Sequence, residues 1–133
     1  MTVEEPRAVA MIPCDHVHVD PQTGKLYVMG PFFEASIDSV PFMFGAIALY
    51  VVLTNARGPH IASASILDPN DEELPSLTRE LALDFTDEKQ RFQFFFSFEN
   101  VVFDQAGEHL FVLRLSGEIV ETCRLNIIVF EGQ

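Results

Sequence analysis

The sequence predicts an all-β fold, an antiparallel β-sandwich formed as a single domain over residues 1–133. Two observations indicate this fold. Apolar and polar residues alternate with a period of two along several segments. Gly, Pro, Asn and Asp also interrupt the chain at short intervals, as turns between strands require. A closed β-barrel is the alternative, because it uses the same alternation and the same turns.

The composition excludes an intrinsically disordered protein and argues against a protein that binds nucleic acid or an anionic membrane. Apolar residues make up 48% of the chain, including 13 Phe, so the chain can bury a core and is not intrinsically disordered. The 8 basic and 20 acidic residues give a net charge of −12. A surface with this charge repels phosphate groups, so we expect no nucleic-acid partner and no binding to an anionic membrane.

The first half of the chain contains four expected strands. A turn at 21–24 and a hairpin loop at 55–59 separate some of them, and 32–39 is expected to be a loop. The segment 41–53 is apolar on both alternating sets, which is typical of a strand covered on both faces. The expected strands are 8–13 with an extended continuation over 16–19, 25–29, 41–53 and 60–67.

The second half contains the clearest alternation, over 91–103, with a weaker strand expected before it at 81–85. Four phenylalanines share one face of 91–103, so this strand should anchor the core. The same segment is an aggregation hazard when exposed, and Lys89, Arg91 and Glu99 flank it as charged gatekeepers. The four core-facing residues are Phe92, Phe94, Phe96 and Phe98.

The last two expected strands, 109–115 and 119–130, form a hairpin around Ser116-Gly117. A two-residue turn would place Phe111 opposite Thr122. A longer loop or a bulge would place Phe111 opposite Cys123 and Leu115 opposite Ile119. Matching of the apolar faces favours the second register.

The motif Asp104-x-x-Gly107-x-His109-x-Phe111 resembles the corner before the penultimate strand of immunoglobulin-like domains. His109 stands where those domains carry a tyrosine, and Phe111 stands where antibody domains carry a cysteine. The resemblance therefore implies an immunoglobulin-like sandwich without the inter-sheet disulfide. By the same analogy, a ring N–H of His109 is expected to bond to the backbone.

A broader similarity covers most of the chain. The chain resembles a family of small uncharacterised bacterial proteins that are regarded as immunoglobulin-like sandwiches. That resemblance implies a soluble bacterial protein of one domain, and it transfers no activity and no functional residue. It rests on Cys14-Asp15, Gly24-Lys25-Leu26, Gly30, Pro41, the turn from Asn55 to Gly58, Asp68-Pro69 and Gly107-x-x-x-Phe111 with its returning strand.

His16 and His18 are the candidate metal ligands. On a regular strand they share a face with Cys14, and paired imidazoles hold Zn²⁺ or Fe²⁺ in proteins. A third ligand would have to come from elsewhere in the chain. Without one, the pair is interpreted as two solvent-facing imidazoles, and no cofactor is expected.

Phe32 and Phe33 are the candidate interface residues, because adjacent exposed aromatics mark contact surfaces. The alternative is that one of them packs beneath the loop. The start of the chain has no basic, apolar leader, which predicts a cytoplasmic protein whose Cys14 and Cys123 are free thiols.

No nucleophile motif or ligand-complete cluster is present, so the leading hypothesis is a non-enzymatic module. It would bind an unknown protein partner or form a homo-oligomer through loops or an exposed edge strand. The alternative hypothesis is a small-molecule or metal-binding domain, even a cupin-like enzyme, centred on His16 and His18.

Overall fold

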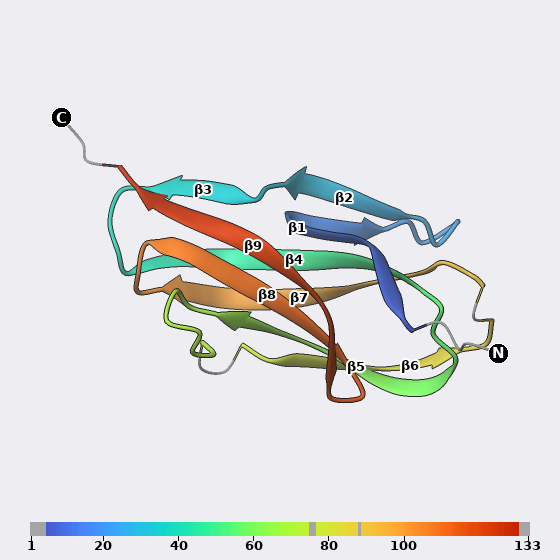
Figure 1. Ribbon diagram of the computed structural model, residues 1–133. Helices are drawn as coiled ribbons and strands as arrows, with labels where there is room; N and C mark the ends of the chain where they lie inside the picture. The colour runs from blue at the N-terminus through green and yellow to red at the C-terminus, as the bar shows by residue number, and fades with distance from the viewer. Residues whose placement is uncertain (1–4, 75–76, 88, 131–133) are drawn as a thin grey trace.

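The computed structural model describes residues 5–74, 77–87 and 89–130, and these residues form nine strands and no helix (Figure 1). Consequently they contain no helix long and apolar enough to cross a membrane. Residues 1–4, which are part of the segment used to exclude a leader, lie outside the described residues, as does Pro75. The strands are β1 (Arg7–Val19), β2 (Leu26–Pro31), β3 (Glu34–Ile37), β4 (Phe42–Thr54), β5 (Gly58–Leu67), β6 (Arg79–Phe85), β7 (Phe92–Phe103), β8 (Gly107–Leu115) and β9 (Glu118–Val129).

The strands form two sheets that pack face to face, which confirms the predicted β-sandwich. The four-stranded sheet has the order β2-β1-β4-β7, and the five-stranded sheet has the order β3-β9-β8-β5-β6. Each sheet therefore ends in an edge strand on both sides, and the alternative of a closed barrel is wrong. In Figure 1, β8 and β9 pass in front of β4 and β7.

The core lies between the two sheets, and β7 contributes its phenylalanine row to it as predicted. Phe94, Phe96 and Phe98 are buried, while Phe92 is half-buried at the open end of the row. They pack against alternate residues of β4 and against Phe111 and Leu113 of β8. At roughly 1.5–3 kcal/mol for each buried phenylalanine, this row is a major source of stability.

The prediction of a loop over 32–39 is wrong, because Glu34–Ile37 forms β3. β3 pairs in parallel with β9, whereas the other strand pairs of the described residues are antiparallel. Its partner lies about ninety residues further along the chain, from Asn126 to Val129. A strand this short that depends on a distant partner leaves little local pattern in the sequence.

β1 unites the two extended segments expected at 8–13 and 16–19. Figure 1 shows the strand turning sharply about half-way along. The first part pairs with β4 and the second with β2, and both pairings include Cys14. Val17, on the second part, packs with Cys14 and Ala48 in a small apolar cluster separate from the main core.

The prediction of a hairpin at 55–59 is wrong, although the residues do turn the chain. Asn55 and Gly58 both have a positive φ, of 64° and 82°. β4 pairs only with β1 and β7, while β5 pairs with β6 and β8. The turn therefore carries the chain from one sheet to the other. Turn residues show that the direction changes, but they do not show which sheet receives the next strand.

The last hairpin combines the two registers considered for it. Near the turn, Leu115 lies opposite Glu118, as a two-residue Ser116-Gly117 turn requires. A register shift between Leu113 and Arg114 then brings Phe111 opposite Cys123. The predicted Phe111 pairing is therefore confirmed, and the predicted pairing of Leu115 with Ile119 is wrong because the bulge comes after the turn.

Candidate functional site

A groove lies at the side of the sandwich, between the edge strands β6 and β7. This lateral groove has a volume of about 600 Å³. Leu81, Leu83 and the phenylalanines of β7 give it an apolar lining. The full lining is Leu26, Arg79, Glu80, Leu81, Leu83, Phe92, Gln93, Phe94, Phe95, Phe96 and Ser97.

β7 is hydrogen-bonded along one side only. β4 pairs with it from Phe42 opposite Phe103 to Leu53 opposite Phe92. No strand among the described residues pairs with its other side. This open edge is twelve residues long, and long open edges are the parts of a sheet that other strands add to.

Arg79 shows which backbone groups face the open edge. Its Nε donates a hydrogen bond to the carbonyl oxygen of Ser97 from β6, across the groove, at 3.2 Å. In an extended strand, the N–H and C=O of every second residue point to the same side. The backbone groups of Gln93, Phe95, Ser97 and Glu99 therefore point to the open edge.

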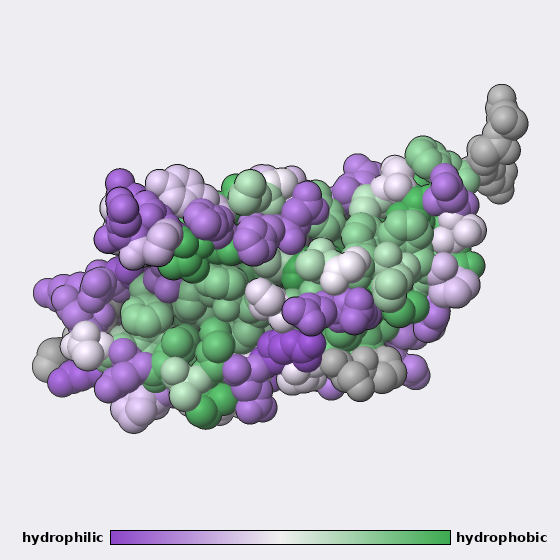
Figure 2. Space-filling view, turned by 180° about the vertical axis from the view of Figure 1, so that it is seen from behind, coloured by the Kyte–Doolittle hydropathy of each residue, from purple (hydrophilic) through white to green (hydrophobic). Residues whose placement is uncertain are grey.

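The surroundings of the open edge combine apolar area with both signs of charge. The Arg79 guanidinium lies 5.8 Å from the centre of the Phe98 ring, as a cation–π contact. The outer face of β7 carries Gln93, Ser97 and Glu99 with the half-buried Phe95. Figure 2 shows apolar residues continuing across the middle of the face seen from behind, between margins of polar residues.

The structure places His16 and His18 on β1 as exposed side chains. Cys14 does not join them, since it is fully buried beside Val17 where the strand bends. His18 instead lies beside Tyr27 of β2, with the ring centres 6.2 Å apart. The described residues contain no group of three or more His, Cys, Asp or Glu side chains that could hold a metal ion. A metal site at His16 and His18 stays a prediction.

The two candidate interface phenylalanines separate. Phe32 packs against the core and stacks on Phe44, with ring centres 6.2 Å apart. Phe33 is 55% exposed, and its carbonyl oxygen accepts a hydrogen bond from the backbone N–H of Asn126. Only Phe33 therefore offers a free aromatic surface. Its part in an interface stays a prediction.

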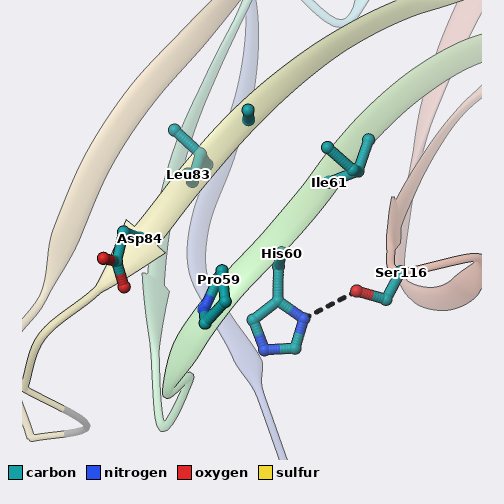
Figure 3. Close-up of a pocket in the computed structure, with 7 residues that line it drawn as sticks. Pro59, His60, Ile61, Leu83, Asp84 and Ser116 are labelled. Atoms are coloured by element: carbon teal, nitrogen blue, oxygen red, sulfur yellow. Dashed lines mark hydrogen bonds between the residues drawn. The ribbon is translucent and has the colours of Figure 1, made fainter.

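A second, shallower hollow of about 390 Å³ lies on β5 and β6 beside the β8–β9 turn (Figure 3). Its polar centre is His60, whose Nδ1 is 2.8 Å from Ser116 Oγ and whose Nε2 is 3.0 Å from the Arg57 carbonyl oxygen. A carbonyl oxygen only accepts, so Nε2–H donates to it, and in the neutral imidazole Nδ1 then accepts from the serine hydroxyl. In Figure 3, the Asp84 carboxylate lies apart from the imidazole, so the three side chains do not form a catalytic triad.

His109 and Cys14 are buried, Cys123 is half-buried, and all three favour their neutral forms. His109 is 1% exposed, and its Nδ1 donates to the Gly107 carbonyl oxygen at 3.1 Å, as the corner resemblance predicted. Burial lowers the pKa of this imidazole. Burial raises the pKa of Cys14, and burial with the Glu121 carboxylate raises that of Cys123 to about 11. Both cysteines are free thiols, and neither is a ready thiolate ligand.

Sequence reasoning missed the groove because its two walls, β6 and β7, are consecutive in the chain but belong to different sheets. It identified the phenylalanine row and the gatekeepers around it, which are signals of a strand that needs protection. It had no means of showing that β7 is an edge strand. Arg79 and Leu83 of β6 carry no motif that marks them.

Comparison with known families identifies the chain. The model of a family of unknown function, DUF6941, matches residues 9–128. The chain belongs to this family. The match covers every strand of the sandwich at least in part, and the family's description assigns no activity.

Two further comparisons add no functional information. No protein with a curated description matches the chain. Among solved structures, a glycosyl hydrolase family 2 member from Bacteroides cellulosilyticus is similar, with a TM-score of 0.47 and 13% sequence identity. The match covers 85% of this chain and 19% of the enzyme chain. A likeness at this level says nothing about activity.

Proposed function

We propose that this DUF6941 protein is a non-enzymatic interaction module that adds an extended strand of a partner to the open edge of β7. The observation that carries the proposal is the continuous unpaired side of β7 beside an apolar groove. Backbone hydrogen bonds along the edge would supply affinity, and the groove would receive alternate side chains of the added strand.

The other edge strands offer less. β3 has four residues, and β2 has six and ends at Pro31. β6 has seven residues, including Arg79, Glu80 and Asp84, and charged residues protect an edge against pairing. β7 has twelve residues, with aromatic side chains on both faces. It therefore presents the longest backbone template of the four edge strands.

The net charge of −12 narrows the choice of partner. Repulsion of phosphate disfavours nucleic acid and anionic lipid, so a protein strand is the partner that suits the edge.

A variant of the edge tests the proposal. Ser97→Pro removes an amide that points away from β4, and proline is tolerated at such positions of edge strands. Ser97→Ala keeps the amide and is the matched control. Copies of the protein with two different tags would be produced together in the cell of origin, and everything retained on the first tag would be identified.

We expect the parent and Ser97→Ala to retain the same protein, either another protein or the second tagged copy, and Ser97→Pro to lose it. Thermal melting would show that Ser97→Pro is folded, and Glu99→Pro would repeat the test further along the edge. Retention of the same proteins by all variants, or of none by the parent, would contradict the proposal.

A further inference from the structure

We infer that the strand added to β7 is β7 of a second copy, in a two-fold antiparallel pairing centred on Phe95. This inference rests on the proposed function, because it names the partner of the same edge. When two identical antiparallel strands pair about a two-fold axis, the numbers of any two opposite residues add up to the same total. When Phe95 lies opposite itself on the axis, this total is set, and it determines which residues face each other along the whole edge.

The backbone geometry allows this centre. Phe95 shares its backbone direction with Ser97, whose carbonyl oxygen faces the open edge and accepts from Arg79. Phe95 would therefore exchange two hydrogen bonds with itself across the axis, and Gln93 would do so with Ser97 of the second copy. A carbonyl oxygen has two acceptor positions, so Ser97 can keep the Arg79 bond while it accepts from the new strand.

The side chains are complementary in this register. On the outer face, Phe95 meets Phe95 across the axis, and Arg91 lies opposite Glu99 of the second copy at both ends. On the inner face, Phe94 lies opposite Phe96, which continues the aromatic row from one sandwich into the next. The gatekeepers Arg91 and Glu99 would thus attract each other between copies in this register alone.

Neighbouring registers lose this complementarity. A two-fold centred on Gln93 places Glu99 opposite Asp87, which repel each other. A two-fold centred on Ser97 places Phe95 opposite Glu99 and leaves Arg91 opposite Phe103. Flanking charges would therefore select the centre at Phe95, while the backbone and the phenylalanines supply the attraction.

The net charge of −12 on each copy opposes the association. Salt screens this long-range repulsion, while the apolar contacts of the edge are not weakened by it. We therefore expect the dimer to strengthen as NaCl is raised from low concentration, which distinguishes it from binding of a basic peptide, since salt weakens that interaction.

Single cysteines test the register on the purified protein in a Cys123→Ala background, with the buried Cys14 left in place. Phe95→Cys would bring two thiols together at the axis, within the roughly 4.4–6.8 Å between Cα atoms that a disulfide needs. Ser97→Cys is the matched control, because its two copies would be separated by four residues along the strand, about 13 Å. We expect rapid oxidation of Phe95→Cys to a disulfide-linked dimer and none of Ser97→Cys.

A charge exchange gives a second, independent readout in sedimentation equilibrium of the otherwise unmodified protein. Arg91→Glu and Glu99→Arg should each weaken the dimer by about tenfold, because each places like charges at both ends of the pair. The double variant Arg91→Glu with Glu99→Arg should recover most of the parent affinity. Thermal melting of each variant would show that the monomer stays folded.

The outcomes separate this inference from the proposed function. A parent protein that stays monomeric at all salt concentrations, or a dimer in which Ser97→Cys cross-links and Phe95→Cys does not, overturns the pairing centred on Phe95. If such a monomer still retains another protein through Ser97, the proposed function stands and only the second copy is wrong as partner. If Ser97→Pro retains the same proteins as the parent, both the proposed function and the pairing centred on Phe95 are wrong.

Discussion

The two sides of the sandwich are built differently. On one side, the chain passes from β2 at the edge of the four-stranded sheet directly to β3 at the edge of the five-stranded sheet. Phe32, in the connection between them, packs into the gap. On the other side, the chain also passes directly from β6, at the edge of the five-stranded sheet, to β7, at the edge of the four-stranded sheet, but the lateral groove lies between these two strands. A connection between edge strands therefore crosses both sides, but Phe32 fills the gap on the closed side, whereas the groove leaves the other side open.

The bent β1 brings a second, smaller apolar cluster onto the four-stranded sheet. Its second half and β2 carry Val17, Leu26 and Val28 into the small cluster with Cys14 and Ala48. Phe95 of β7 also packs against this cluster, while among the described residues no strand pairs with the open edge of β7, where Arg79 donates to Ser97. The closed side therefore ends in two short edge strands, β2 and β3, whereas the open side presents the long edge of β7 beside the groove.

The largest effect is expected from removing the anchor of the open side. Phe98 is fully buried and contacts Phe111 of the opposite sheet, with ring centres 5.9 Å apart. Phe98→Ala should lower the free energy of unfolding by about 3–5 kcal/mol, through lost burial and the cavity left behind. Urea unfolding followed by circular dichroism measures it, and a loss below about 1 kcal/mol would show that β7 is not the anchor of the core.

The closed side should depend on one phenylalanine of the adjacent pair. Phe32→Ala should cost about 1–2 kcal/mol, because the ring is half-buried against Phe44. Phe33→Ala should stay within about 0.5 kcal/mol of the parent, because that ring is exposed. The two variants serve as each other's control in the same urea experiment, and equal losses would contradict the assignment of Phe32 to the gap.

The end of β7 should respond to acid through His109. Its ring packs edge-on against Phe103, with centres 4.9 Å apart. Because burial lowers the pKa of the folded imidazole below 6.5, the unfolded chain binds more protons as the pH falls through that value. Stability is then complete above the unfolded pKa and declines below it, by at most about 1.4 kcal/mol per pH unit.

His109→Phe keeps the ring against Phe103 and removes the titration. Between about pH 7 and pH 5, its free energy of unfolding should fall less steeply than that of the parent, since the other histidines are common to both proteins. Parallel pH profiles of the two proteins would show that His109 does not favour its neutral form in the fold.

The smallest effect concerns Gly30, near the end of β2 on the closed side. Gly30 has a φ of 66°, and an added Cβ would collide with the Asp15 carboxylate. Gly30→Ala should cost about 1 kcal/mol from the left-handed backbone, with a further loss from the collision. In an Asp15→Ala background the second part should disappear, and thermal melting of the four proteins separates the two contributions. A Gly30→Ala protein as stable as the parent would contradict both.

Much of the architecture could be predicted from local pattern. The alternation in 91–103 identified β7 and its core-facing phenylalanines, and the turn residues located nearly every change of direction. The register of the last hairpin was predicted at Phe111, where a whole apolar face depends on it, and not at Leu115, where a bulge intervenes. β3 was not predicted because its strand conformation depends on pairing with Asn126 to Val129 and not on a pattern in its own residues.

The candidate site shows where local pattern ends. The sequence by itself determined an acidic β-sandwich, since alternation, turns and charge are properties of neighbouring residues. It also determined that the phenylalanine row of β7 needs protection. Only the tertiary structure decided that this strand lies at an edge, that Phe32 is covered while Phe33 is not, and that Cys14 is buried apart from His16 and His18. These results depend on which distant strands pair and where a strand bends, and hydrogen bonds between distant residues leave no local record in a single chain.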